Sequence, residues 1–368
     1  MRLEAFTCHK DPRRPHANDD RIAVHGSRLF CVIDGVTDKS GRALPDGSSR
    51  GQAAGVLVER ALLRLADDGA LMTAPTASVL EAIQQTFCDE YRRRGIEEDV
   101  ARDPHLRFGA QLAAVFHRAD AWRVFVVGDC GVRINGERVV TCRNEGDTVL
   151  ALWRAAVFGA VLARGPVADV TDGLALHVSL GRSHTDLALD IARRYTVAGS
   201  GRFIEEFAAW FPESEYRRCA ARTESDALGR FAHLGSTLVA DTLANGLIGL
   251  AKHRNADGPL GSPCIDGTVV PPRQAHDETL SAADVATLEL FSDGYFGTPA
   301  PGATTLSDWE AHLAYVEAVD PHKVDAFAST KGSGSGTFTD DRTVVIIEPG
   351  WTKDVRAGRP IQVGGDGR

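Results

Sequence analysis

Apolar runs of strand length that stop at an acidic residue constrain this chain more than any other feature. The first occupies residues 29–36, LFCVIDGV, where strand-forming residues are followed by Asp34 and Gly35. A carboxylate at the end of a buried strand is held rigidly, and a glycine after it lets the backbone approach a ligand closely. Oxygen atoms held in this way suit a hard divalent cation. Taken alone, the run is also explained by a strand that enters an Asp-Gly turn.

The same pattern recurs along the chain. Four further strand-like runs have acidic residues at one end: 22–24 after Asp19 and Asp20, 122–127 before Asp129, 286–291 before Asp293, and 344–347 after Asp340 and Asp341. Because hairpins bring the ends of neighbouring strands together, we expect these carboxylates to line one cleft. Carboxylates gathered closely repel one another and raise their pKa values, and a divalent metal relieves that repulsion. All-oxygen ligation favours Mg²⁺ or Mn²⁺, whereas the absence of clustered His and Cys argues against zinc.

Apolar periodicity predicts the remaining elements. Helices are expected at 50–68 and 77–94, as a pair packed on a sheet, and at 306–319, where Ser307 could be the N-cap. Between 144 and about 270 the pattern is less regular: it predicts helices at 149–162, 185–198 and 201–211, and a helix or a strand pair at 236–251. No repeat or low-complexity linker marks a domain boundary. We therefore expect a largely helical insertion in one domain, and a loosely held tail at 351–368.

Composition narrows the class of protein. The 368 residues are 43% hydrophobic and 25% charged, which is typical of a globular protein, and the net charge of −9 argues against a nucleic-acid surface. Seven scattered cysteines without a C-x-x-C pair indicate reduced thiols and a cytoplasmic protein. The polar N-terminus does not resemble a signal peptide, and no apolar run is expected to span a membrane. Serine-hydrolase and P-loop motifs are absent.

Five acidic blocks together resemble the metal-dependent PPM or PP2C protein phosphatases, in a divergent bacterial form. The blocks are NDDR (18–21), VIDG (32–35), VGDCG (127–131), LFSDG (290–294) and DDRTVV (340–345), in the order and rough spacing of that family. The resemblance covers about residues 1–141 and 284–348. It implies an α+β fold, a four-layer α-β-β-α sandwich of two antiparallel sheets flanked by helix pairs. One phosphatase domain would then occupy residues 1–350, with the mostly helical insertion at about 144–270.

The resemblance also implies a set of site residues. The metal ligands would be Asp19, Asp20, Asp34, Gly35, Asp129, Asp293 and Asp340, holding two or three Mn²⁺ or Mg²⁺ ions. Asp34 would bridge two ions with the Gly35 carbonyl as a further ligand, and Asp34 and Asp293 would be the catalytic residues. Asp293 and Asp340 would complete one metal site, and Asp19 or Asp20 would serve the other. Asp129 would help to hold a weaker third ion, and a metal-activated water would attack the phosphate monoester.

Three positions depart from that family's pattern or stay open. Val36 stands where the family has a histidine that is thought to protonate the leaving oxygen. The family's phosphate-binding arginine falls near Pro15, so Arg13 and Arg14 are the candidates for this role. Lys331 begins a Gly-Ser loop at 331–336 that could contact a phosphate, although a flexible connector explains it more simply.

Three functions fit these observations. The first is a phosphoserine/phosphothreonine protein phosphatase, and the second is a phosphatase of the same chemistry that acts on a small phosphorylated metabolite. The third is a non-catalytic regulatory module, which retention of the principal carboxylates disfavours. The expected partner is a phosphorylated protein or small molecule, with no nucleic acid and no membrane. The sequence indicates neither the choice between the two substrates nor the oligomeric state.

Overall fold

Two five-stranded sheets form the centre of the computed structural model, which describes residues 1–36, 43–165, 183–332 and 337–350. Sheet A has the order β1 (Arg2–Cys8), β10 (Arg342–Glu348), β9 (Leu288–Phe291), β6 (Gly131–Ile134), β7 (Arg138–Thr141). Sheet B has the order β2 (Arg21–His25), β3 (Leu29–Gly35), β4 (Ala110–Arg118), β5 (Ala121–Val127), β8 (His276–Ser281). Every pairing of neighbouring strands is antiparallel.

Side-chain alternation along the strands creates the layers. On β3, Phe30 and Val32 point into the core between the sheets, where they meet residues such as Leu290 of β9. Cys31 and Ile33 point the other way, into the core beneath the helices. Strands buried on both faces read as continuous apolar runs, which is why β3 and β4 show little alternation of polar residues.

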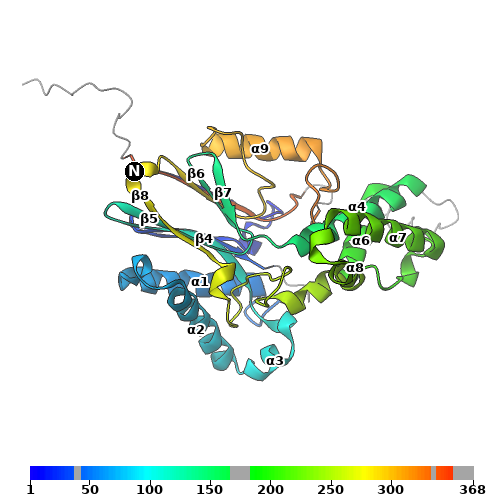
Figure 1. Cartoon of the computed structure of the whole chain (residues 1–368), viewed down its shortest axis with the longest axis horizontal. Helices are drawn as coiled ribbons and strands as arrows, with labels where there is room; N and C mark the ends of the chain where they lie inside the picture. The colour runs from blue at the N-terminus through cyan, green and yellow to red at the C-terminus, as the bar shows by residue number, and fades with distance from the viewer. Residues whose placement is uncertain (37–42, 166–182, 333–336, 351–368) are drawn as a thin grey trace, which may run out of the picture.

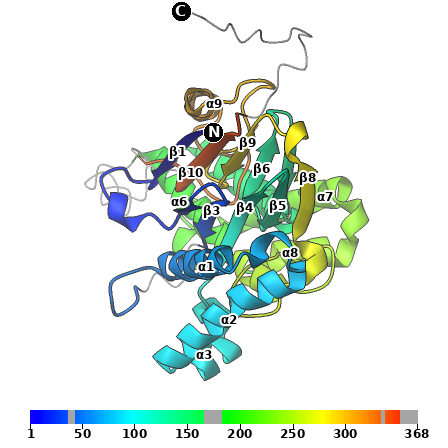
Figure 2. The ribbon, with the colours of Figure 1, turned by 90° about the vertical axis from the view of Figure 1, so that its left-hand side faces the viewer.

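Helices cover the outer face of each sheet. Helices α1 (Arg50–Asp67) and α2 (Thr76–Arg94) pack on sheet B, followed by the short α3 (Glu97–Arg102). Helix α9 (Leu306–Val319) packs on sheet A. Figure 2 shows the resulting order of layers, with α9 on one side and α1 and α2 on the other. The expected α-β-β-α sandwich is therefore confirmed, with one helix rather than a pair as the described cover of sheet A.

Four helices form a separate bundle beside the sandwich (Figure 1). They are α4 (Glu145–Arg164), α6 (His184–Ala198), α7 (Glu213–Arg230) and α8 (Ser236–Leu250). Their buried side chains, including Trp153 and Tyr195, make a core of their own. This bundle is the mostly helical insertion that was expected at 144–270. Whether it is part of one domain stays a prediction, and the tail at 351–368 lies outside the described residues.

Several local predictions were wrong. Residues 201–211 form only a 3₁₀ turn (Glu205–Phe207), whereas α7 was not predicted because its sequence is mostly polar. The polar edge strand β8 was also missed, for the same reason. The N-cap of α9 is Thr305 rather than Ser307, since the Thr305 side chain accepts a hydrogen bond from the Asp308 backbone N–H.

No apolar run of the sequence is expected to be long enough to span a membrane, and helix α4 departs from this expectation. In length and composition it is the one helix among the described residues that could cross a membrane, and half of its apolar window is buried inside the protein. Val149, Trp153 and Val157 of α4 lie fully buried in the core of the insertion. This packing is typical of a core helix.

Candidate metal and phosphoryl-transfer site

Strand register brings the predicted acidic residues to one end of the two sheets. Gly131 of β6 pairs with Phe291 of β9, so continuing the same register places Asp129 opposite Asp293. Asp34 follows Phe30 and Val32 with the same parity, and therefore lies on the side of β3 that faces sheet A. The antiparallel topology thus joins carboxylates that are up to 259 positions apart in the sequence.

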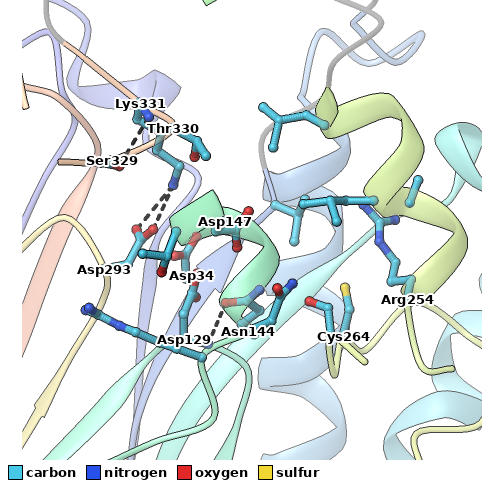
Figure 3. A pocket seen from close by; sticks show the side chains of 18 of the residues that line it. Asp34, Asp129, Asn144, Asp147, Arg254, Cys264, Asp293, Ser329, Thr330 and Lys331 are labelled. Atoms are coloured by element: carbon cyan, nitrogen blue, oxygen red, sulfur yellow. Dashed lines mark hydrogen bonds and ion pairs between the residues drawn. The ribbon is translucent and has the colours of Figure 1, made fainter. Parts of the chain in front are cut away.

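Asp34, Asp129 and Asp293 form what we call the acidic triad. Each offers one carboxylate oxygen, and these three oxygens lie within 4.8 Å of one another. Figure 3 shows the three side chains converging at one edge of a cavity. Among the described residues, Asp129 Oδ1 is buried without a hydrogen-bond partner.

In two of the three triad carboxylates, Asp34 and Asp129, the ionised form is disfavoured. Burial, followed by the Asp293 charge, raises the pKa of Asp34 well above its ordinary value. The same two causes raise the pKa of Asp129 to about 8. Carboxylates shift in this direction when neither water nor a counter-charge stabilises their ionised form.

Asp340 lies beside the triad, bound to two lysines. Lys331 Nζ donates to Asp340 Oδ2 and to both Asp293 oxygens, at 3.0 and 3.2 Å. Lys10 Nζ lies 3.4 Å from Asp340 Oδ1. Although burial alone would raise it, the pKa of Asp340 falls to about 2 because Lys331 and Lys10 stabilise its charge.

The two early aspartates differ in their surroundings. Asp19 accepts a hydrogen bond from Ser49, and burial raises its pKa to about 6. A Cβ added at Gly51 would lie 2.9 Å from the Gly35 carbonyl oxygen and 3.0 Å from the Asp19 carboxyl carbon, so these two candidate ligands border the same point. Asp20 is buried and accepts a 2.7 Å hydrogen bond from Oγ of Ser292, the residue that precedes Asp293.

Both Asp-Gly glycines are required by close contacts. A Cβ at Gly35 would lie 2.6 Å from the Gly51 backbone and 2.7 Å from the Asp19 carbonyl oxygen. At Gly294 it would lie 1.9 Å from the Asp341 carbonyl oxygen. Backbone segments can approach this closely only without a side chain, so the glycines let neighbouring strand ends bring their carboxylates together.

A cavity of about 250 Å³ opens from the triad toward the insertion. Its walls include Asp34, Val36, Asp129, Asp293 and Lys331 on the sandwich side, and Asn144, Asp147, Leu247, Leu250 and Arg254 from the insertion. In Figure 3, Arg254 lies across the cavity from the triad. The expectation that the insertion covers part of the cleft is therefore met.

Not every predicted site residue reaches this cavity. Arg13 and Arg14 are exposed and are not among its lining residues, and Arg13 pairs instead with Asp11 at 2.7 Å. Sequence reasoning missed Arg254 and His105, which do line it. No local pattern marks these two residues. Lys331 was considered as a phosphate contact, but its ammonium points at carboxylates.

Comparisons with known proteins give only distant similarities. No protein-family model and no curated protein matches the chain. Among solved structures, the Mycobacterium tuberculosis serine/threonine phosphatase PstP/Ppp is 16% identical, with a TM-score of 0.39 over 94% of this chain and 97% of that one. The Staphylococcus aureus serine/threonine phosphatase Stp1 is 11% identical, with a TM-score of 0.39 over 95% and 94%.

The residues present fit a divalent metal. The triad is all-oxygen, which suits Mg²⁺ or Mn²⁺. Asp34 and Asp129 have raised pKa values, and a buried Asp129 oxygen has no partner among the described residues. A cation at this position would supply both the missing charge and the missing ligand contact.

Proposed function

We propose that the chain is a metal-dependent phosphatase of the PPM or PP2C type, which hydrolyses phosphate monoesters with Mn²⁺ or Mg²⁺. The observation that carries the proposal is the acidic triad, whose three carboxylate oxygens lie within 4.8 Å of one another at the edge of a cavity. Carboxylates with raised pKa values in a cleft are typical of functional sites. The four-layer fold and the order of the five acidic blocks support the same family.

The proposed ligands divide into two groups. The acidic triad would hold one ion, with Asp340 beside it, and Asp19 with the Gly35 carbonyl would contribute to a second. Bound ions would supply a water nucleophile at neutral pH and neutralise charge on the phosphoryl group. The rigid strand ends fix the backbone of the ligands before any ion binds, so these strand ends need little reorganisation.

Residues from the insertion would then orient the substrate. Arg254 faces the triad across the cavity and can bind phosphate oxygens in a fork geometry. Leu247 and Leu250 provide apolar wall beside it. A cavity of about 250 Å³ suits a phosphorylated side chain better than a whole folded surface. This volume also admits a small phosphorylated metabolite. We favour phosphoserine and phosphothreonine peptides as substrates because the order of the five acidic blocks resembles that of the PPM or PP2C protein phosphatases.

Activity of the Asp34→Asn variant tests the proposal. We expect wild type to hydrolyse phosphate monoesters with Mn²⁺ and to lose activity in excess EDTA. Asp34→Asn should fold but lose nearly all turnover, whereas Asp284→Asn, an exposed acid outside the cavity, should behave as wild type. Full activity of Asp34→Asn, or of wild type in EDTA, would contradict the proposal.

A substrate panel separates the remaining alternatives. Phosphopeptides and small phosphorylated metabolites are compared by kcat/KM with wild type and with Arg254→Met. We expect phosphopeptides to be preferred and the variant to raise KM for them. Preference for a metabolite would favour the second candidate, and Mn²⁺ binding without any turnover would indicate a non-catalytic module.

A further inference from the structure

We propose that Lys331 is a tethered cation that occupies the position between Asp293 and Asp340 in the metal-free protein, and that a divalent ion must displace it to bind this pair. The inference rests on the proposed function, because it concerns the same acidic residues. It adds a competition between a side chain of this protein and its metal. The chain would thereby set its own metal affinity.

The contacts of Lys331 carry the proposal. Its ammonium lies 3.0 and 3.2 Å from the two Asp293 oxygens and also contacts Asp340 Oδ2. A Mg²⁺-type ion binds carboxylate oxygens at about 2.0–2.1 Å, so an ion ligated by these same oxygens would overlap the ammonium group. Charge repulsion acts in the same direction. The ion and the lysine therefore exclude each other.

The segment that precedes Lys331, residues 322–329, is held in place by the insertion. Arg154 of α4 is buried and donates to the backbone carbonyls of His322, Lys323 and Ser329, at 2.8–3.2 Å. Within the loop, the Ser329 backbone N–H donates to the Lys323 carbonyl, and Lys331 N–H donates to Ser329 Oγ. These contacts hold the backbone that leads to Lys331. Residues 333–336 of the Gly-Ser connector lie outside the described residues, so its flexibility stays a prediction.

Asp320 orders the beginning of the same loop. Its carboxylate accepts hydrogen bonds from the backbone N–H groups of Val324, Asp325 and Phe327. Lys323 is fully buried and pairs with Glu317 at 2.8 Å. An ordered platform therefore presents Lys331, although the lysine side chain itself is 29% exposed and has a path outward.

The charge balance explains why the lysine would give way. Lys331 faces both Asp293 and Asp340, and Lys10 also reaches Asp340, whereas Asp34 and Asp129 have no ion pair with a lysine among the described residues. A divalent ion brings twice the charge to the same place and can also reach the unpartnered Asp129 oxygen. Lys331 thus stabilises the metal-free site, and the ion stabilises the loaded one more strongly.

Manganese binding to Lys331→Met is the first test. Titration calorimetry would be performed with MnCl₂ on wild type, Lys331→Met and the control Lys252→Met, whose exposed ammonium pairs with Asp241 of the insertion. We expect Lys331→Met to bind Mn²⁺ about tenfold more tightly or better, with little change in Lys252→Met. Metal-free Lys331→Met should melt at a lower temperature than wild type and gain more from Mn²⁺.

A measurement on wild type covers the case in which the variant does not fold. The amine of Lys331 is labelled with an acetylating reagent, with and without Mn²⁺, and quantified by mass spectrometry. We expect Mn²⁺ to increase labelling of Lys331 and to leave the buried Lys323 unchanged. Unchanged or decreased labelling of Lys331 would overturn the inference.

The outcomes distinguish the two proposals. Equal or weaker Mn²⁺ binding by Lys331→Met, with normal activity of wild type, would refute the competition and leave the phosphatase proposal intact. A raised KM with unchanged Mn²⁺ affinity would make Lys331 a substrate contact and would also refute it. If neither protein binds Mn²⁺ and wild type has no phosphatase activity, the proposed function itself fails.

Discussion

Asp129→Asn should make the metal-free protein more stable while it weakens catalysis. The carboxylate of Asp129 is packed against two other acids, and one of its oxygens has no partner among the described residues. Asparagine keeps the shape of the side chain and the backbone N–H that donates to Gln111 Oε1, but removes the charge. Burial and the Asp293 charge disfavour the ionised form of Asp129, so removal of the Asp129 charge should relieve the metal-free state.

The magnitude follows from the pKa. A carboxyl whose pKa is raised in the folded state, here from 3.8 to about 8, stabilises the fold only while it keeps its proton. Its contribution is complete below pH 3.8 and is lost as the pH rises toward 8. At about 1.4 kcal/mol per pKa unit, the raised pKa lowers the free energy of unfolding at pH 7 by about 4 kcal/mol relative to a carboxyl with its ordinary pKa. A proton on Asp34 relieves the same repulsion, so we expect a gain of about 2–4 kcal/mol for Asp129→Asn.

Urea unfolding in EDTA provides the assay. Wild type, Asp129→Asn and the exposed control Asp284→Asn are compared at pH 4 and pH 7. The gain for Asp129→Asn should be near zero at pH 4 and largest at pH 7, and Asp284→Asn should show no such dependence. With metal present, Asp129→Asn should turn over more slowly and require more Mn²⁺. The reasoning is refuted if the variant is less stable at pH 7, or if its gain is the same at both pH values.

Two further predictions concern other parts of the molecule. Val36 lines the cavity at a position where a histidine could act as a general acid. We therefore expect kcat/KM to fall steeply as the leaving-group pKa of phosphate monoesters rises, and Val36→His to flatten this dependence. A shallow dependence in wild type would show that another acid already protonates the leaving group, and His105 on the cavity wall is the candidate. Glu289→Ala should lower the free energy of unfolding in urea by about 3–5 kcal/mol. The variant leaves buried Arg133 without its carboxylate partner and removes the 2.7 Å hydrogen bond from Trp309 Nε1. A loss below about 1 kcal/mol would show that the backbone carbonyls bound by Arg133 are enough to stabilise its charge.

Much of the fold could be predicted from local patterns. The apolar runs of β3 and β5 are long enough to identify buried strands, and the 3.6-residue periodicity identifies α1 and α2. Each acidic residue at a strand end was also visible. These features depend on neighbours in the sequence, and therefore sequence alone determines them.

The sequence did not show elements whose stability comes from long-range packing. Helix α7 has a mostly polar sequence and buries only a narrow stripe that includes Tyr216 and Ala227 against the other helices of the insertion. Strand β8 is polar at most positions, and becomes a strand because its backbone pairs with β5. In both cases the partner, rather than the local propensity, selects the conformation.

The composition of the site was decided by tertiary structure. The sequence indicated Asp34, Asp129 and Asp293 as separate strand ends, and the antiparallel register of the sheets brought their oxygens within 4.8 Å. Arg254 reaches the cavity because the insertion folds back over it, and Lys331 reaches Asp293 from a segment whose Ser329 carbonyl accepts a hydrogen bond from Arg154. Local patterns determine what each segment can become, whereas contacts between segments distant in the chain determine which charges meet.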